Sequence, residues 1–105
     1  MQMKEQYIAI TDSINLWVET YGDRNYPACI FINGAGANSS FWSDNLCNTL
    51  VEKGFYVIKY DHRDFGYSDK LDFEKQPYDV MDLAKDTITI LDSLDIKKAH
   101  IVGHS

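Results

Sequence analysis

The stretch that decides the fold is A-H-I-V-G-H-S, residues 99–105. Its first four residues are typical of a buried strand, and Gly103-His104-Ser105 matches the first half of a Gly-x-Ser-x-Gly motif. In that motif a sharp turn between a strand and a helix exposes the serine hydroxyl. Because Gly-x-Ser alone is also common in ordinary turns, the preceding sequence must distinguish a turn from a nucleophile.

The preceding sequence alternates β-rich and helix-like segments. Their order predicts a hairpin formed by residues 6–11 and 14–21, a strand at 28–32, a helix at 41–53, a strand at 55–60, a helix at 79–94 and a last strand from 97. A turn at 22–25 is expected to close the hairpin. Strands that alternate with helices form parallel sheets, so we predict an α/β fold: an antiparallel β-hairpin followed by β-α-β-α-β with parallel strands.

The two helices have recognisable ends. Ser39 or Ser40 is the expected N-cap of the first helix, and Gly54 fits its end. Asp79 and Asp82 can accept hydrogen bonds from the first-turn amides of the second helix. This second helix has an apolar stripe that we expect to face the protein core, and it consists of Val80, Ala84, Ile88, Leu91 and Leu94.

Composition and charge exclude several classes of partner. The net charge is -6 and no cluster of Lys or Arg is present, so we expect no nucleic-acid partner. The longest apolar runs are too short to span a bilayer, and no secretory signal is evident, so we expect no membrane partner. Cys29 and Cys47 are interpreted as packed thiols of a reduced, cytoplasmic protein. His62, His100 and His104 have no metal-ligand spacing, so we expect no metal.

A glycine-rich segment, N-G-A-G-A at residues 33–37, follows the predicted strand at 28–32. One hypothesis is a nucleotide-binding Rossmann loop, with Asp61 near the position of a ribose-binding acid; however, Ser39 stands where the third glycine is needed. The other is an oxyanion loop, in which the Ala35 backbone N–H meets the negative charge that develops during acyl transfer. A tight turn without a ligand is the third alternative.

The polar segment D-H-R-D-F-G-Y-S-D-K, residues 61–70, is interpreted as a structural loop. Arg63 is expected to pair with Asp61 or Asp64, and Gly66 to adopt a positive φ. A direct catalytic role is disfavoured because no obvious nucleophile stands beside a base in this segment.

Together these motifs resemble the α/β-hydrolase fold family over nearly the whole sequence. The matching residues are Asn33-Gly34-Ala35 followed by Phe41-Trp42, then Asp61, Arg63, Gly66 and Ser68, and finally Gly103-His104-Ser105. Two residues depart from the family pattern, because Asn33 replaces a usual histidine and Asp64 a usual glycine. The Asp-His-Arg-Asp sequence is similar to that of some esterases acting on polyketide-type methyl esters.

The resemblance implies a serine hydrolase. Ser105 would be the nucleophile of a nucleophile elbow, and the Ala35 N–H would form part of the oxyanion hole. Gly34, Phe41, Trp42 and His104 would border the substrate pocket, although packing is the competing role for Phe41 and Trp42. The implied substrate is a small-molecule ester or related acyl compound, cleaved through an acyl-enzyme without a cofactor. Ser105 argues against dehalogenases and epoxide hydrolases, whose nucleophile is an aspartate.

Two alternatives from other functional classes remain open. Some members of the family serve as ligand receptors or binding proteins with little turnover. A nucleotide-binding Rossmann-type domain is the second alternative, and it depends on Gly34, Gly36 and Asp61.

The resemblance also implies that other residues complete the site. In the family the triad acid and histidine follow the serine in the chain. We therefore expect residues 1–105 to be the N-terminal portion of a single α/β-hydrolase domain, with the remainder of the same chain as its partner. The second oxyanion donor would follow Ser105.

This expectation predicts the behaviour of residues 1–105 expressed alone. The last strand would be an apolar parallel strand with an open edge, so we expect an insoluble or molten polypeptide. Circular dichroism during heating, combined with a sedimentation measurement, tests this. A soluble monomer with a cooperative thermal transition would contradict it.

Overall fold

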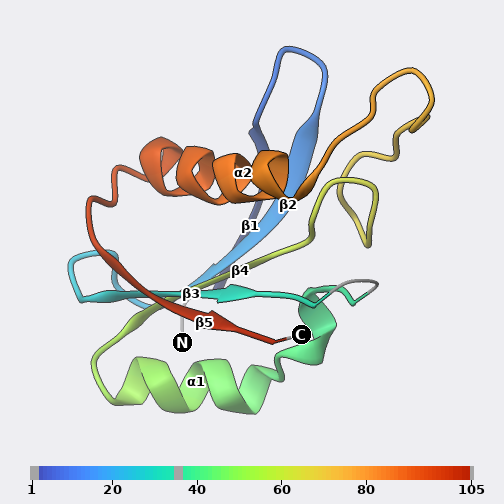
Figure 1. Ribbon diagram of the computed structural model, residues 1–105. Coiled ribbons are helices and arrows are strands. Elements are labelled where there is room, and N and C mark those ends of the chain that lie inside the picture. The colour runs from blue at the N-terminus through green and yellow to red at the C-terminus, as the bar shows by residue number, and fades with distance from the viewer. Residues whose placement is uncertain (1–2, 35–36, 105) are drawn as a thin grey trace.

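The computed structural model describes residues 3–34 and 37–104 (Figure 1). Within them the elements are β1 (Met3–Ala9), β2 (Asn15–Tyr21), β3 (Ala28–Ile32), the short 3-10 helix η1 (Ser39–Phe41), α1 (Asp44–Glu52), β4 (Tyr56–Tyr60), α2 (Val80–Ser93) and β5 (Ala99–Gly103). None of the helices in the described part of the chain has the length and apolar character needed to cross a membrane.

The strands form one mixed sheet in the order β1-β2-β4-β3-β5. β1 pairs antiparallel with β2, and β2 pairs antiparallel with β4. The first strand of the hairpin begins and ends earlier than the predicted 6–11, and residues 10–14 connect it to β2, so the expected closing turn at 22–25 was wrong. β3 pairs in parallel with β4 on one side and with β5 on the other. The predicted fold class, a hairpin followed by parallel strands connected by helices, is therefore confirmed.

Two apolar layers cover the faces of the sheet. Alternation along the strands sends Ile30 and Ile58 to one face, where they pack with Ile90 of α2. Cys29, Phe31 and Val57 face the other side, in one cluster with Cys47 of α1. Figure 1 shows the two helices on opposite faces. Because β3 and β4 are buried on both faces, their sequences are apolar almost throughout.

Helix α1 begins later than predicted. Its N-cap is Ser43, whose side chain accepts a hydrogen bond from the Leu46 N–H. The two predicted N-cap residues, Ser39 and Ser40, both belong to the short helix η1. Trp42 lies between the two helices in an extended conformation, so the predicted start at residue 41 was wrong. The end is as predicted, because Gly54 has a φ of 92° and its N–H donates to the Val51 carbonyl.

Helix α2 has the predicted ends but a different buried face. Asp79 and Asp82 form a reciprocal capping box at its start. Of the expected stripe, Leu91 and Leu94 pack against the core as predicted. Val80 is 80% exposed, Ile88 is 59% exposed and Ala84 is exposed as well, so the prediction was wrong at these three positions. The residues that α2 buries are Asp86, Thr87 and Ile90.

Two polar contacts explain this rotation of α2. Arg63 donates from Nε and from its terminal nitrogen to both carboxylate oxygens of Asp86, at 2.9 and 2.7 Å. The hydroxyls of Thr87 and Tyr60 lie 2.7 Å apart. The predicted pairing of Arg63 with Asp61 or Asp64 was therefore wrong. Arg63 pairs with Asp86 instead and attaches the loop after β4 to α2.

The Arg63–Asp86 pair yields a stability prediction. Replacing Asp86 by Ala leaves a buried guanidinium without its carboxylate, which should cost about 3–5 kcal/mol of unfolding free energy. Asp92→Ala removes the same charge from an exposed position of α2 and should change stability by less than about 0.5 kcal/mol. Urea denaturation of the purified full-length protein measures both. Equal effects of the two substitutions would contradict a stabilising role for the pair.

Candidate active site

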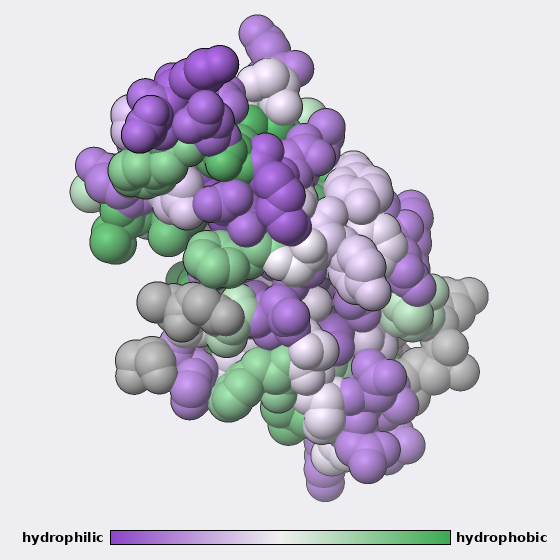
Figure 2. Space-filling view, turned by 90° about the vertical axis from the view of Figure 1, so that its right-hand side faces the viewer, coloured by the Kyte–Doolittle hydropathy of each residue, from purple (hydrophilic) through white to green (hydrophobic). Residues whose placement is uncertain are grey.

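The candidate site lies where the parallel strands end. The carboxyl ends of β3, β4 and β5 meet at one edge of the sheet, and Asn33, Asp61 and His104 follow them directly. The helix after β3 covers one face and the helix after β4 covers the other, so β3 and β5 flank the point where the strand order reverses. Open α/β sheets bind ligands at such a point. Figure 2 shows the face toward which these ends point, with hydrophilic and smaller hydrophobic areas interspersed.

Asn33 is buried at this edge and its side chain forms two hydrogen bonds. Nδ2 donates to the Tyr60 carbonyl at the end of β4, and Oδ1 accepts from the Trp42 indole Nε1, both at 2.7 Å. The Asn33 carbonyl lies 3.1 Å from Nε2 of His62, and because a carbonyl only accepts, Nε2 carries the proton. Nδ1 of His62 is buried without a partner among the described residues.

Phe41, Trp42 and His104, three of the predicted pocket residues, lie together. The Trp42 ring is buried and stacks on Phe31, with 4.5 Å between centroids, so packing is an established role for Trp42. Phe41 is 51% exposed, and its ring centroid lies 4.2 Å from that of His104. The His104 N–H donates to the Ile32 carbonyl, which extends the β3–β5 pairing by one residue. Gly34 is buried.

Asp61 connects the segments that follow β3 and β4. Its carboxylate accepts the Ser39 N–H at 2.6 Å through Oδ1 and the Tyr67 N–H at 2.9 Å through Oδ2. The Ser68 hydroxyl donates to the Asp61 carbonyl at 2.6 Å. Asp61 is fully buried. Since both carboxylate oxygens already bind backbone amides, Asp61 is not placed to bind a ribose, and the Rossmann alternative loses its acidic residue.

Two residues of the polar loop adopt the left-handed conformation. Gly66 has a φ of 54°, as predicted, and a Cβ on it would overlap the Asp61 carboxylate. Asp64 has a φ of 74° at the position where the family usually has glycine. The Asp64 Oδ1 accepts the Leu71 N–H at 3.1 Å, a local bond of the kind that lets aspartate tolerate this conformation.

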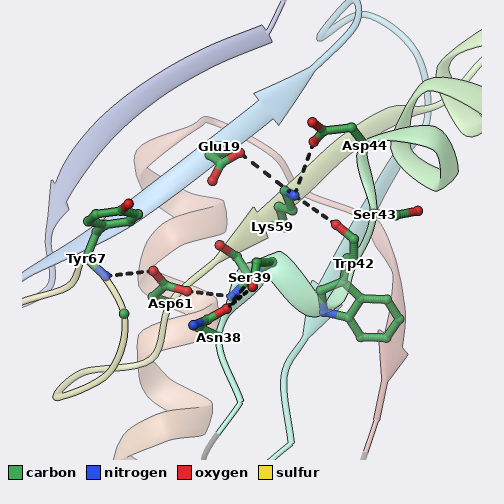
Figure 3. Close-up of a pocket in the computed structure, with 11 residues that line it drawn as sticks. Glu19, Asn38, Ser39, Trp42, Ser43, Asp44, Lys59, Asp61 and Tyr67 are labelled. Carbon is green, nitrogen blue, oxygen red and sulfur yellow. Dashed lines mark hydrogen bonds and ion pairs between the residues drawn. The ribbon is translucent and has the colours of Figure 1, made fainter.

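A pocket of about 510 Å³ lies on the side of residues 38–44 that faces β2 and β4 (Figure 3). Lys59 is buried in it, and its Nζ donates to the Trp42 carbonyl at 2.9 Å and lies 3.9 Å from Glu19 and 3.6 Å from Asp44. The ammonium group is therefore already compensated by a carbonyl and two carboxylates. We assign this pocket a structural role, because its charged groups are already bound to one another or to backbone groups. Phe41, whose ring lies beside that of His104, is not among the residues that line it.

Other chemical groups near the site are unsuited to catalysis. Cys29 and Cys47 are buried, and burial raises the pKa of both thiols, that of Cys47 to about 11. Neither is therefore an activated nucleophile. In residues 3–34 and 37–104, no group of three or more His, Cys, Asp or Glu side chains is arranged to hold a metal ion.

The predicted nucleophile and oxyanion donor, Ser105 and Ala35, lie outside the described residues. The structure describes their neighbours, so it places Asn33 and Gly34 before Ala35 and His104 before Ser105 at the same edge of the sheet. The roles of Ser105 and Ala35 remain predictions.

Residues 27–105 match a family model described as alpha/beta hydrolase fold. Among curated proteins, rhodomycin D methylesterase DnrP of Streptomyces peucetius is 38% identical over 94 residues, which are 90% of this chain and 32% of that protein. 3-Oxoadipate enol-lactonase 1 of Acinetobacter baylyi is 32% identical over 90 residues, 86% of this chain and 32% of that protein. Epoxide hydrolase A of Mycobacterium thermoresistibile has a crystal structure that matches with a TM-score of 0.85 and 25% identity, over 99% of this chain and 32% of that one. The chain thus spans about a third of the length of each of these relatives.

The contact of Gly66 with Asp61 generates a prediction. Gly66→Ala introduces both a left-handed alanine and a clash with the carboxylate, whereas Gly54→Ala introduces only the strain, because nothing lies within 4 Å of a Cβ there. We expect Gly54→Ala to cost about 1–2 kcal/mol of stability. Gly66→Ala should cost at least about 1 kcal/mol more, because Asp61 must weaken its hydrogen bonds. Chemical denaturation of the full-length variants compares them, and equal losses would refute the role assigned to this contact.

Proposed function

The chain belongs to the α/β-hydrolase fold family, and from this premise we propose that it supplies the nucleophile and one oxyanion donor of a serine hydrolase. The observation that carries the proposal is the convergence of β3 and β5 at one edge: the segment containing Ala35 begins where β3 ends, and Ser105 follows the extended pairing of His104 with Ile32. A nucleophile and an oxyanion donor must approach the same carbonyl group, and this topology supports such an arrangement.

We further propose that the substrate is an ester or a related acyl compound. Two of the relatives are named as a methylesterase and an enol-lactonase, and both of those substrate classes contain an acyl–oxygen bond. The epoxide hydrolase is the counterexample, and Ser105 in place of an aspartate nucleophile favours acyl chemistry over epoxide opening.

The proposed reaction proceeds through an acyl-enzyme. Oγ of Ser105 attacks the acyl carbon while its proton passes to a histidine outside this segment, and the carbonyl oxygen becomes an oxyanion near the Ala35 N–H. Collapse of this intermediate expels the alcohol, which takes the proton from the histidine. Water then hydrolyses the acyl-enzyme by the same steps, which releases the acid and regenerates Ser105.

The domain organisation is proposed on the same basis. The chain corresponds to about a third of its relatives, and β5 is the edge strand of the described sheet. We propose that residues 1–105 are the N-terminal portion of one hydrolase domain, whose triad acid and histidine lie in sequence that follows Ser105.

Substitution of Ser105 tests the proposal in the full-length protein. Ser105→Ala should lower kcat for p-nitrophenyl butyrate by about 10⁴-fold or more, because a triad without its nucleophile retains little of its rate enhancement. Ser93→Ala, at the exposed end of α2, is the matched control and should retain the wild-type rate. A fluorophosphonate probe should label Ser105 in the wild type and in the control. Turnover by Ser105→Ala, or labelling of another residue, would overturn the assignment.

A further inference from the structure

The Asn33 carboxamide closes the segment that carries the proposed oxyanion donor. Asn33 directly precedes Gly34, and Trp42 lies nine residues further along, so the bond from Trp42 Nε1 to Asn33 Oδ1 joins the two ends of that segment. The bond from Nδ2 to the Tyr60 carbonyl attaches this junction to the end of β4. We propose that Asn33 is a positioning residue for the oxyanion-binding segment, an inference that rests on the proposed function.

The environment of Asn33 requires a side chain that both donates and accepts. Tyr60 presents a carbonyl oxygen, which only accepts, and the Trp42 indole presents an N–H, which only donates. Both contacts are buried, so a side chain that satisfied one of them would leave the other group unpaired and away from water. Asparagine satisfies both at 2.7 Å, whereas an apolar side chain of the same size satisfies neither.

Other contacts hold the same segment at separate points. Asp61 accepts the Ser39 N–H, and Lys59 donates to the Trp42 carbonyl. These bonds do not involve the Asn33 side chain, so they remain when it is replaced. Among the described residues, Asn33 is the residue whose side chain links the start of the segment, next to Gly34, with its end at Trp42. Removing this link should therefore relax the geometry of the segment while the fold persists.

Such relaxation affects the transition state more than substrate binding. An oxyanion donor acts only at about 2.7–3.1 Å from the developing charge. A misplacement of about 1 Å can lower a rate by about 10²-fold. The expected effect of losing the Asn33 bridge is therefore a lower kcat with a nearly unchanged KM, which differs from a loss of folded protein.

Three variants of the full-length protein test this with p-nitrophenyl butyrate. Asn33→Leu should lower kcat by about 10²-fold and change KM by less than about threefold. Asn33→Asp retains an acceptor but places a carboxylate against the Tyr60 carbonyl, so it should also lower kcat. Asn33→His, the residue usual in the family, can donate from one ring nitrogen and accept at the other, and should restore kcat to within about tenfold of the wild type.

Trp42→Phe removes the partner of Asn33 Oδ1 while retaining a ring against Phe31. Its kcat should fall by about tenfold, and the double variant Asn33→Leu/Trp42→Phe should be no slower than Asn33→Leu, because both substitutions break one link. Trp17→Phe is the matched control, since it removes the same indole N–H, which here donates to Glu19 on β2 and takes no part in the link between Asn33 and Trp42. It should retain the wild-type kcat.

The outcomes separate this inference from the proposed function. Fluorophosphonate labelling of Ser105 in the wild type, with a wild-type kcat for folded Asn33→Leu, would overturn the positioning role alone. Absence of labelling in the wild type would overturn both. Circular dichroism and the thermal midpoint establish folding; where Asn33→Leu fails to fold, Trp42→Phe decides, and a kcat equal to that of Trp17→Phe refutes the inference.

Discussion

The architecture of the candidate site depends on one buried carboxylate at the end of β4. Asp61 binds a backbone amide of the segment after β3 and another of the loop after β4, and the bare Cα of Gly66 leaves room for it. A buried carboxylate needs such donors, and the two segments need an acceptor for their amides. This mutual requirement brings together loops that no strand pairing connects. Asn33 and Lys59 then fix the details of the same region.

Local sequence patterns predicted most of the fold because the determining physics is local. Strands β3 and β4 are apolar on both faces, Gly54 ends α1, and Asp79 with Asp82 starts α2. The error in the buried face of α2 arose where long-range polar contacts outweighed apolar periodicity. Because Arg63 pairs with Asp86, α2 turns a charged residue inward and leaves Ile88 exposed. An aspartate four residues before Ile90 on the buried face was the signal that could have revealed this pairing.

The site was predictable in outline but not in its contacts. The spacing of Asn33-Gly34-Ala35, Asp61 and Ser105 identified the segments that meet at the edge of the sheet. It could not reveal the Asn33 bridge, because hydrogen bonds between residues 33, 42 and 60 depend on side-chain placement after folding. The buried Lys59 was likewise missed, since a lysine within an apolar strand gives no indication of which partners compensate its charge.

The distribution of cysteine over the two layers has a practical consequence. Cys29 on β3 and Cys47 on α1 are the two cysteines of the sequence, and both lie in the apolar cluster on the α1 side of the sheet. The opposite cluster, which contains Ile90 of α2, has none. Under native conditions a thiol reagent can therefore react only when the α1 layer opens. The rate at which the reagent modifies Cys29 and Cys47 would therefore report the local opening equilibrium of the α1 layer. It would not depend on opening of the apolar layer between the sheet and α2.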